Sequence, residues 1–300
     1  MMLNNIFNFT ISNTIDYVPE QIIDFFSKKY VSGPSLSDAV KTTIDLNSKG
    51  MMSTIDVLGE FVQNEDQTIF FRNECIKVLE TIKEESLNAN LSLKPTQMGL
   101  AINKALCYEN IRKIVRRAKE LDNFVRIDME NSPYTTDTLK MYKLLREEFP
   151  GHVGTVLQAY LRRTIDDIDK LSDKNLNIRL CKGIYVESYK IAYKNPELIN
   201  ENYIYCLEKL FDNKAYVGIA THDEKLIFHA MKLIRKYNLQ PNEYEFQMLL
   251  GIGDELRDFI LSKKHRLRIY VPYGKEWLSY VRRRLKENPN IIKTALGLKL

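Results

Sequence analysis

The chain has 300 residues, of which 44% are hydrophobic. This length allows two ordinary domains at most, or one large barrel or α/β domain, and the hydrophobic content excludes a disordered chain or a small disulfide scaffold. The 44 basic and 39 acidic residues leave a formal net charge of +5. They are scattered too evenly along the chain to indicate nucleic-acid binding by themselves.

Cysteine usage and the absence of long apolar runs indicate a reduced, soluble setting. The four cysteines lie far apart without a Cys-x-x-Cys pair, and with only four histidines they predict no zinc site. The N-terminus lacks a basic region followed by an apolar core, so we expect no secretory signal. No run approaches the length of a membrane span. We therefore expect a cytoplasmic globular protein.

The first fifty residues have helical periodicity without strand character. Apolar residues recur through Ile22, Ile23, Phe25 and Phe26, and a second helical run extends from Ser35 or Asp38 to Leu46. Gly33-Pro34 separates the two runs. We predict a helical segment over residues 1–50 and a catalytic domain over residues 51–300.

From residue 53 onward, short apolar or β-branched runs alternate with longer amphipathic stretches such as 66–87, 98–121, 137–148 and 224–238. Eight strand–helix units in this length match a (β/α)8 barrel. A doubly wound open sheet is the alternative, but it usually has a glycine-rich loop after its first strand, and none is present here. The predicted strands are 53–60, 89–94, 123–130, 152–160, 176–183, 215–222, 242–251 and 266–274.

Polar and ionisable residues gather at the carboxyl ends of the predicted strands, where active sites of such barrels lie. A ligand-binding mouth is the simplest cause of this distribution. The residues are Lys94, Asp128, Glu130, Gln158, Arg179, Lys182, Thr221, His222, Glu245, Gln247 and Tyr270.

Two of these groups have competing interpretations. Lys94 is a solvated loop lysine, a Schiff-base nucleophile, or a cation that receives a carboxylate or phosphate. Asp128 caps the following helix or forms an ion pair with Lys94 across neighbouring strands.

The run RLCKGIY, residues 179–185, combines two cations with a glycine that permits close backbone approach. Arg179 and Lys182 cannot share one face of a strand, so Lys182 belongs to the turn. Such a loop suits a phosphate-bearing or electron-rich cofactor, although a simple basic turn would have the same composition. His222 is a candidate donor to a cofactor, and Thr221 or Asp223 is expected to cap the next helix.

A C-terminal helix is expected over residues 275–288. In it Tyr280, Arg283, Arg284 and Glu287 share a broad face, so the carboxylate can hold both guanidiniums as a fork for an anionic group. Arg282 points away from that face and is expected to be solvated. We expect that Trp277 packs this helix onto the barrel.

These motifs together resemble the proline dehydrogenase family, of the short monofunctional bacterial kind. The match runs from about Ser92 to Asn288, through SLK, RIDME, VGTVLQAYLRRT, RLCKGIY, IATHD, YEFQMLLGIG and the tyrosine and paired-arginine block. The sequence departs from the family at Ile184, where alanine is commoner.

The resemblance implies a distorted (β/α)8 barrel that binds FAD, with the last helix over the barrel mouth. It implies oxidation of L-proline to 1-pyrroline-5-carboxylate, with electrons passed to a membrane quinone. A separate 1-pyrroline-5-carboxylate dehydrogenase would then receive the product. We expect no nucleic-acid partner, and at most peripheral contact with the inner face of the membrane.

The resemblance also implies site roles. Asp128 and Arg179 would be catalytic, Asp128 as the partner of the lysine and Arg179 against the flavin. Residues implied to bind substrate are Lys94, Tyr270, Tyr280, Arg283, Arg284 and Glu287. Residues implied to contact FAD are Met129, Gln158, Arg179, Lys182, Gly183, Ile184, Tyr185, Thr221 and His222; Tyr185 would also pack on the substrate ring.

Overall fold

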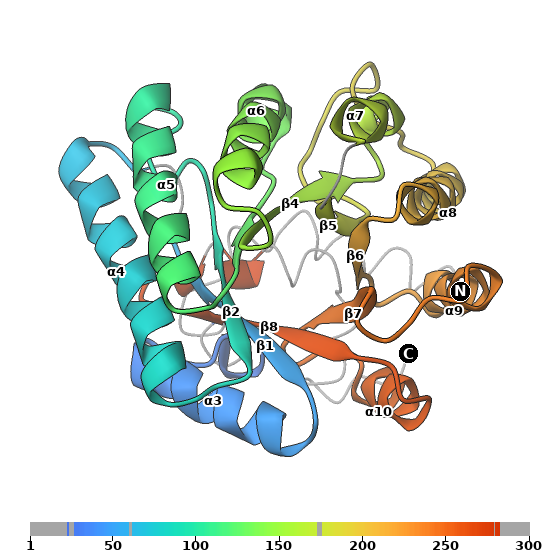
Figure 1. Cartoon of the computed structure of the whole chain (residues 1–300), viewed down its shortest axis with the longest axis horizontal. Coiled ribbons are helices and arrows are strands. Elements are labelled where there is room, and N and C mark those ends of the chain that lie inside the picture. Colours follow the sequence, from blue (N-terminus) through green and yellow to red (C-terminus); the bar gives the residue numbers. More distant parts are fainter. Residues whose placement is uncertain (1–22, 24–26, 60–61, 173–175, 279, 283–300) are drawn as a thin grey trace.

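The computed structural model describes residues 23, 27–59, 62–172, 176–278 and 280–282. Eight parallel strands pair in chain order, and β1 pairs with β8 to close a barrel (Figure 1). This confirms the predicted barrel and excludes the open doubly wound sheet. The strands are β1 Met52–Val57, β2 Ala89–Leu93, β3 Val125–Ile127, β4 Val153–Gln158, β5 Asn177–Cys181, β6 Tyr216–Ala220, β7 Tyr244–Leu249 and β8 Leu267–Tyr273.

Amphipathic helices surround the barrel, so the strands are covered on their outer face. β1 and β4 are buried along their whole length, as expected for parallel strands between a packed interior and a helical layer. The described helices are α3 Leu36–Ser48, α4 Glu65–Glu84, α5 Lys104–Glu120, α6 Ser132–Glu148, α7 Thr164–Leu171, α8 Pro196–Asp212, α9 Glu224–Lys236 and α10 Asp254–Ser262.

Two helix starts differ from the sequence prediction, and local chemistry explains both. α5 begins six residues after the predicted position 98, because Asn103 caps its N-terminus by accepting from the N–H groups of Ala105 and Leu106. α6 begins five residues before the predicted 137, because Pro133 occupies its first turn, where its missing N–H costs nothing.

The N-terminal helix α3 packs against β1 and β8, where a regular barrel would carry the helix that follows β8. Its residues Ala39 and Leu46 belong to the main hydrophobic core. The division of the chain at residue 50 stays a prediction, although α3 shares the core of the barrel.

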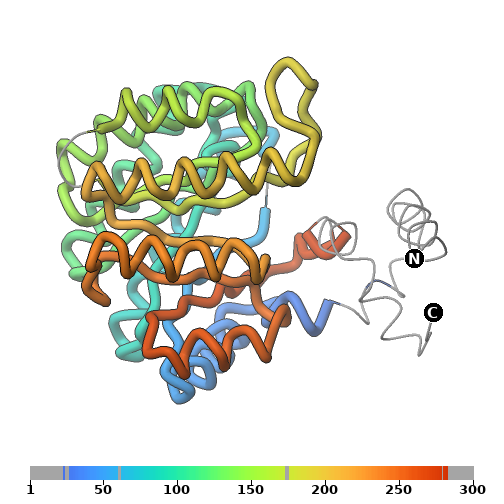
Figure 2. Tube along the Cα trace, turned by 90° about the vertical axis from the view of Figure 1, so that its right-hand side faces the viewer, coloured from blue at the N-terminus to red at the C-terminus, as the bar shows by residue number. Residues whose placement is uncertain are grey.

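The chain after β8 is helical at residues 277, 278 and 280–282, and this short piece lies beyond the carboxyl end of β8, at one end of the barrel (Figure 2). Tyr280 and Val281 are buried in a small cluster with Tyr30 and Leu58, and Trp277 packs against that cluster. The expected packing role of Trp277 is therefore confirmed. The rest of the predicted helix, with Arg283, Arg284 and Glu287, lies outside the described residues.

The lower interior of the barrel is polar. Tyr216, Glu245 and Arg268 form a group, here called the floor cluster, in which Glu245 and Arg268 are buried and Tyr216 is half-buried. Arg268 Nε and Nη2 donate to the two carboxylate oxygens of Glu245 at 2.7 and 3.1 Å, and the Tyr216 hydroxyl donates to Glu245 at 2.7 Å. Burial by itself would raise the pKa of Glu245, but the charge of Arg268 and these hydrogen bonds lower it to about 2.

The floor cluster predicts a specific acid lability. The folded pKa of Glu245 lies below its ordinary value of 4.5, so its contribution to stability is present above that pH and is lost as the pH falls toward 2. We expect the free energy of unfolding at neutral pH to fall by about 3 kcal/mol or more in Glu245→Gln. Between about pH 5 and 3, we also expect the free energy of unfolding of Glu245→Gln to decline less steeply than that of the unmodified chain. Urea unfolding at several pH values measures both.

The matched control is Asp45→Asn, which removes an exposed carboxylate paired with Lys49 at 2.7 Å. It should keep the pH slope of the unmodified chain, because exposed ion pairs contribute little to stability. Equal slopes for Glu245→Gln and the unmodified chain would contradict the role given to the floor cluster.

Candidate active site

A cavity of about 470 Å³ opens at the carboxyl ends of the strands, the end of a barrel that carries its chemistry. Every described residue to which the resemblance assigns a catalytic, substrate-binding or FAD-binding role lines it. They are Lys94, Asp128, Met129, Gln158, Arg179, Lys182, Gly183, Ile184, Tyr185, Thr221, His222, Tyr270 and Tyr280. Further lining residues are Val156, Cys181, Ala220, Asp223, Gln247, Met248 and Leu249.

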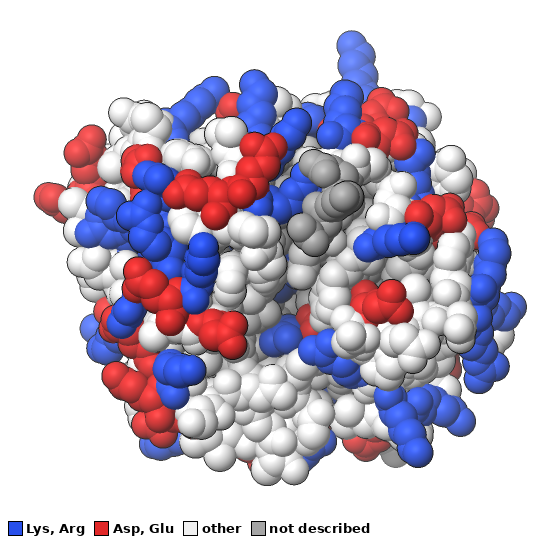
Figure 3. Space-filling view, viewed as in Figure 1, with Lys and Arg blue, Asp and Glu red and all other residues white. Residues whose placement is uncertain are grey.

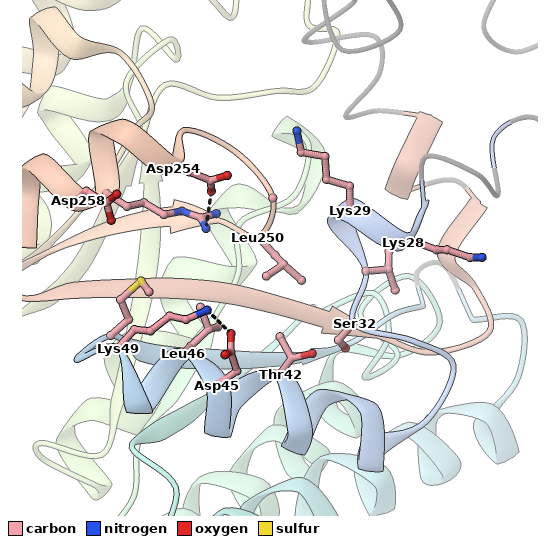
Figure 4. Close-up of a pocket in the computed structure, with 14 residues that line it drawn as sticks. Lys28, Lys29, Ser32, Thr42, Asp45, Leu46, Lys49, Leu250, Asp254 and Asp258 are labelled. Carbon is pink, nitrogen blue, oxygen red and sulfur yellow. Dashed lines mark hydrogen bonds and ion pairs between the residues drawn. The ribbon is translucent and has the colours of Figure 1, made fainter. Parts of the chain in front are cut away.

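A second cavity of about 480 Å³ lies outside the barrel, between α3, α10 and residues 28–32 (Figure 4). Four of its charged groups neutralise one another in two ion pairs, Lys49 with Asp45 and Arg257 with Asp254. No predicted site residue lines it. We therefore take the cavity at the mouth of the barrel as the candidate active site.

Asp128, which directly follows β3, is the centre of the hydrogen bonding in the cavity. Arg179 Nη1 and the Ser92 hydroxyl donate to its Oδ1 at 2.6 and 2.7 Å, and the Tyr270 hydroxyl donates to its Oδ2 at 2.8 Å. These donors come from β2, β5 and β8, so the bonds cross the interior of the barrel. The carboxylate thereby fixes three strands' side chains relative to one another.

The sequence analysis missed Asp56, which lies in β1 below the cavity and is fully buried. Lys94 Nζ donates to its two carboxylate oxygens at 3.0 and 2.9 Å, whereas Asp128 Oδ2 lies 4.0 Å from Lys94 Nζ. Lys94 therefore pairs mainly with Asp56, and its expected ion pair with Asp128 is the longer of the two. An aspartate inside an apolar strand was the available signal, because a buried carboxylate requires a partner.

The protonation states of this group follow from burial. Burial raises the pKa of Asp56 to about 6, and Lys94 opposes that rise. Burial, reinforced by Asp128, raises the pKa of Tyr270 well above its ordinary value, so the phenol keeps its proton and donates to Asp128. The guanidinium carbon of Arg179 lies 5.3 Å from the centre of the Tyr270 ring, which adds a cation–π contact.

Lys182 and Asp223 form the outer rim of the cavity. Lys182 follows β5 as expected for a turn residue, and its Nζ lies 2.7 Å from Asp223 Oδ2. Asp223 also caps α9 through the N–H groups of Lys225 and Leu226, which confirms the expected cap. One side chain therefore begins a helix and holds a cation at the cavity.

His222 is oriented by the backbone, since its Nε2 accepts from the N–H of Leu249 at 2.9 Å. In the neutral ring the proton is then on Nδ1, which makes that atom the donor. The Thr221 hydroxyl accepts from the N–H of Asp223 at 3.1 Å and so shapes the same turn. Among the described residues, no cluster of histidine, cysteine or carboxylate side chains could hold a metal ion.

Gln158 and Gly183 shape the wall beneath Lys182. The side-chain nitrogen of Gln158 donates to the carbonyls of Met129 and Glu130 at 3.2 and 3.0 Å, while its Oε1 is buried without a hydrogen-bond partner among the described residues. Gly183 has φ +110°, and a Cβ there would lie 2.1 Å from the Tyr160 ring. Only glycine fits this position.

Two strand-end residues do not reach the cavity, contrary to the sequence expectation. Glu130 is turned into the barrel wall, where it accepts from the backbone N–H and the hydroxyl of Thr96 at 2.8 and 2.5 Å. Glu245 lies deeper, in the floor cluster. In both cases a nearby donor satisfies the carboxylate away from the mouth.

Comparison with known proteins adds a family and several relatives. Residues 39–294 match the family model described as "Proline dehydrogenase". Proline dehydrogenase 2 of Bacillus subtilis is 39% identical over 267 residues, which cover 89% of this chain and 88% of that protein. Proline dehydrogenase of Deinococcus radiodurans is 32% identical and is matched over 88% of this chain and 86% of its own length.

Solved structures give the same fold. Proline utilization A of Bdellovibrio bacteriovorus superposes with a TM-score of 0.82 at 24% sequence identity, over 87% of this chain. Proline utilization A of Bradyrhizobium japonicum gives a TM-score of 0.74 at 20% identity. The chain spans about a third of the length of these solved chains, 32% and 31%, and the similarity supports the barrel architecture.

The geometry at Gly183 predicts the effect of a single methyl group. We expect Gly183→Ala to lower the free energy of unfolding by about 3 kcal/mol or more, because it adds a clash with Tyr160 to an unfavourable φ. Gly50→Ala is the matched control, since Gly50 has φ +79° and nothing within 4 Å of an added Cβ. Its expected cost is about 1 kcal/mol. Urea unfolding compares the two, and equal losses would contradict close packing at Gly183.

Proposed function

Because the match over residues 39–294 makes this chain a member of the proline dehydrogenase family, we propose that it oxidises L-proline to 1-pyrroline-5-carboxylate with FAD as cofactor. The observation that carries the proposal is this match, which spans the whole barrel and every lining residue of the cavity at its mouth. The relatives named above are proline dehydrogenases of comparable length.

The residues at the mouth fit a flavin nucleotide. Gly183 leaves its backbone open to close approach, the Lys182 side chain offers a cation for a phosphate, and the buried Gln158 Oε1 is an acceptor for an N–H group. His222 offers its Nδ1 proton. We propose that these groups hold FAD together with Met129, Arg179, Ile184, Tyr185 and Thr221. When bound, FAD would supply the acceptor for the hydride that leaves the ring carbon of proline.

Proline itself is a zwitterion, so its carboxylate needs a fixed cationic partner. We propose that Arg283 and Arg284 bind the carboxylate, that Glu287 holds both guanidiniums, and that Lys94 lies beside them. Tyr270, Tyr280 and Tyr185 would pack on the ring and exclude water. Such a fork orients the substrate, and orientation can supply several kcal/mol of the barrier.

The buried group around Lys94 favours this role over Schiff-base chemistry. A Schiff-base lysine must attack as a neutral amine, whereas the bidentate contact with Asp56 favours the charged ammonium. Lys94 is also within 3.5 Å of the Tyr270 hydroxyl. We propose that Lys94 contributes positive charge to the carboxylate site, and that Asp128 holds Arg179 and Tyr270 in place.

We further propose that a quinone reoxidises the flavin and that a separate 1-pyrroline-5-carboxylate dehydrogenase receives the product. None of the helices in the described part of the chain is long and apolar enough to cross a bilayer. Basic and acidic side chains intermingle on the face seen in Figure 3, which does not favour nucleic acid as a partner on that face.

The visible absorption spectrum tests the proposal most directly. We expect the purified protein, loaded with FAD, to be yellow and to bleach when L-proline is added without oxygen. The same sample with an amino acid that lacks a ring is the control. A preparation that takes up no FAD would overturn the proposal, and trapping of a substrate on Lys94 by borohydride would favour an aldolase.

The proposed carboxylate fork predicts a separation of kinetic constants. We expect Arg284→Ala to raise KM for proline by about 100-fold, or about 2.7 kcal/mol, with little loss of bound FAD. The control is Lys275→Ala, which removes an exposed cation shortly before the same helix. Arg282 is not suitable, because it is half-buried with a buried Nε, contrary to the expected solvation. Loss of FAD in parallel with the rise in KM would mean that the helix is only structural.

A further inference from the structure

We propose that Gln247 is a positioning residue that sets the orientation of the Arg179 guanidinium from below. The inference rests on the proposed function, because it concerns the cation that would lie against the flavin. Arg179 Nε donates to Gln247 Oε1 at 2.6 Å, and Gln247 Nε2 donates to Glu245 Oε1 at 2.6 Å. One amide thus joins the cavity to the floor cluster.

The chemistry of the two partners determines how this amide is turned. Glu245 has a pKa of about 2, so at neutral pH its carboxylate only accepts hydrogen bonds. Arg179 only donates them. The amide of Gln247 must therefore direct its nitrogen to Glu245 and its oxygen to Arg179.

Few side chains can replace glutamine at this point. A glutamate would bring a second carboxylate against Glu245, and a lysine would bring a second cation against Arg179. An apolar residue would remove one hydrogen bond from each partner in a buried site, since Gln247 is only 7% exposed. Glutamine is the neutral residue that both accepts and donates at this length.

The barrel wall makes room for this amide. A Cβ at Gly218, in β6, would lie 2.4 Å from Gln247 Nε2. Gly218 does not line the cavity, so its lack of a side chain is explained by Gln247 rather than by a ligand. Gly218 and Gln247 thus form one packing unit.

The hydrogen bonds that run from Arg179 through Gln247 to Glu245 are rigid, because Glu245 is held by two further residues. Glu245 accepts from Arg268 and from Tyr216, so the carboxylate that receives Gln247 cannot turn freely. At the upper end, Arg179 Nη1 is held by Asp128. With Nε and Nη1 fixed, the plane of the guanidinium is fixed as well. Arg179 lines the cavity, so the fixed guanidinium is part of the cavity wall.

A fixed cation matters for the proposed reaction. A guanidinium held beside the flavin ring of FAD would stabilise the negative charge that reduction adds to that ring. It does so without reorganisation of the site only when the guanidinium is fixed in position beforehand. Loss of the Gln247 bond should therefore make the bound flavin harder to reduce. It should affect proline binding less, because no proposed carboxylate contact involves Gln247.

The test compares Gln247→Met with Tyr216→Phe, both loaded with FAD. Gln247→Met keeps the length of the side chain and removes both bonds, while Tyr216→Phe removes one bond to the same carboxylate and leaves the Gln247 bridge intact. We expect the midpoint potential of bound FAD to become more negative only in Gln247→Met. We expect kcat for proline to fall by about tenfold there, with KM nearly unchanged. The dissociation constant for FAD and the thermal unfolding of both variants are measured alongside.

A potential in Gln247→Met equal to that of the unmodified chain would overturn the inference. An equal shift in Tyr216→Phe would overturn it too, because it would point to general loosening of the floor cluster. If Gln247→Met does not fold, the same measurements on Gly218→Ala test the inference, because the added methyl group displaces the side-chain amide of Gln247. Failure of the unmodified protein to take up FAD would instead refute the proposed function.

Discussion

The site depends on the hydrogen bonds that the carboxylate of Asp128 accepts. This carboxylate sits where β3 ends and receives hydrogen bonds from Ser92, Arg179 and Tyr270, which belong to three other strands. Without this anion, each donor would be held less firmly. Tied to one buried anion, they present a fixed surface to the cavity, which is what catalysis by orientation requires.

The interior of this barrel is charged, and three of its cations are paired with carboxylates. Asp56 faces Lys94, Asp128 faces Arg179, and Glu245 faces Arg268. Arg126, also buried, instead donates to the carbonyls of Thr155 and Asn177 and to the side-chain oxygen of Asn177. A buried ion without a partner would cost several kcal/mol, so removal of either member of a pair should be more harmful than replacement of both. Gln247 connects two of these pairs, because it is neutral and bonds to both signs of charge. A typical barrel of this class fills the same space with branched apolar residues.

Much of the site could be predicted because parallel strands bring their carboxyl ends to one place. The positions of Lys94, Asp128, Gln158 and Arg179 toward the carboxyl ends of predicted strands were enough to predict that these side chains share a cavity. Asp56 escaped prediction because the first strand was predicted to continue to residue 60, whereas β1 ends at Val57, one residue after Asp56. Glu130 was wrongly assigned to the mouth, because Thr96 supplies donors that no spacing rule reveals.

The sequence by itself determined the order of strands and helices, since hydrophobic periodicity and helix caps such as Asp223 are local properties. It also determined which residue types gather at the mouth. Only the tertiary structure decided that Lys94 pairs mainly with Asp56, that α3 takes the place of a barrel helix, and that Gln247 joins Arg179 to the floor cluster. These features depend on which side chains meet across the interior of a closed barrel, and such distances are set by packing among residues far apart in the chain.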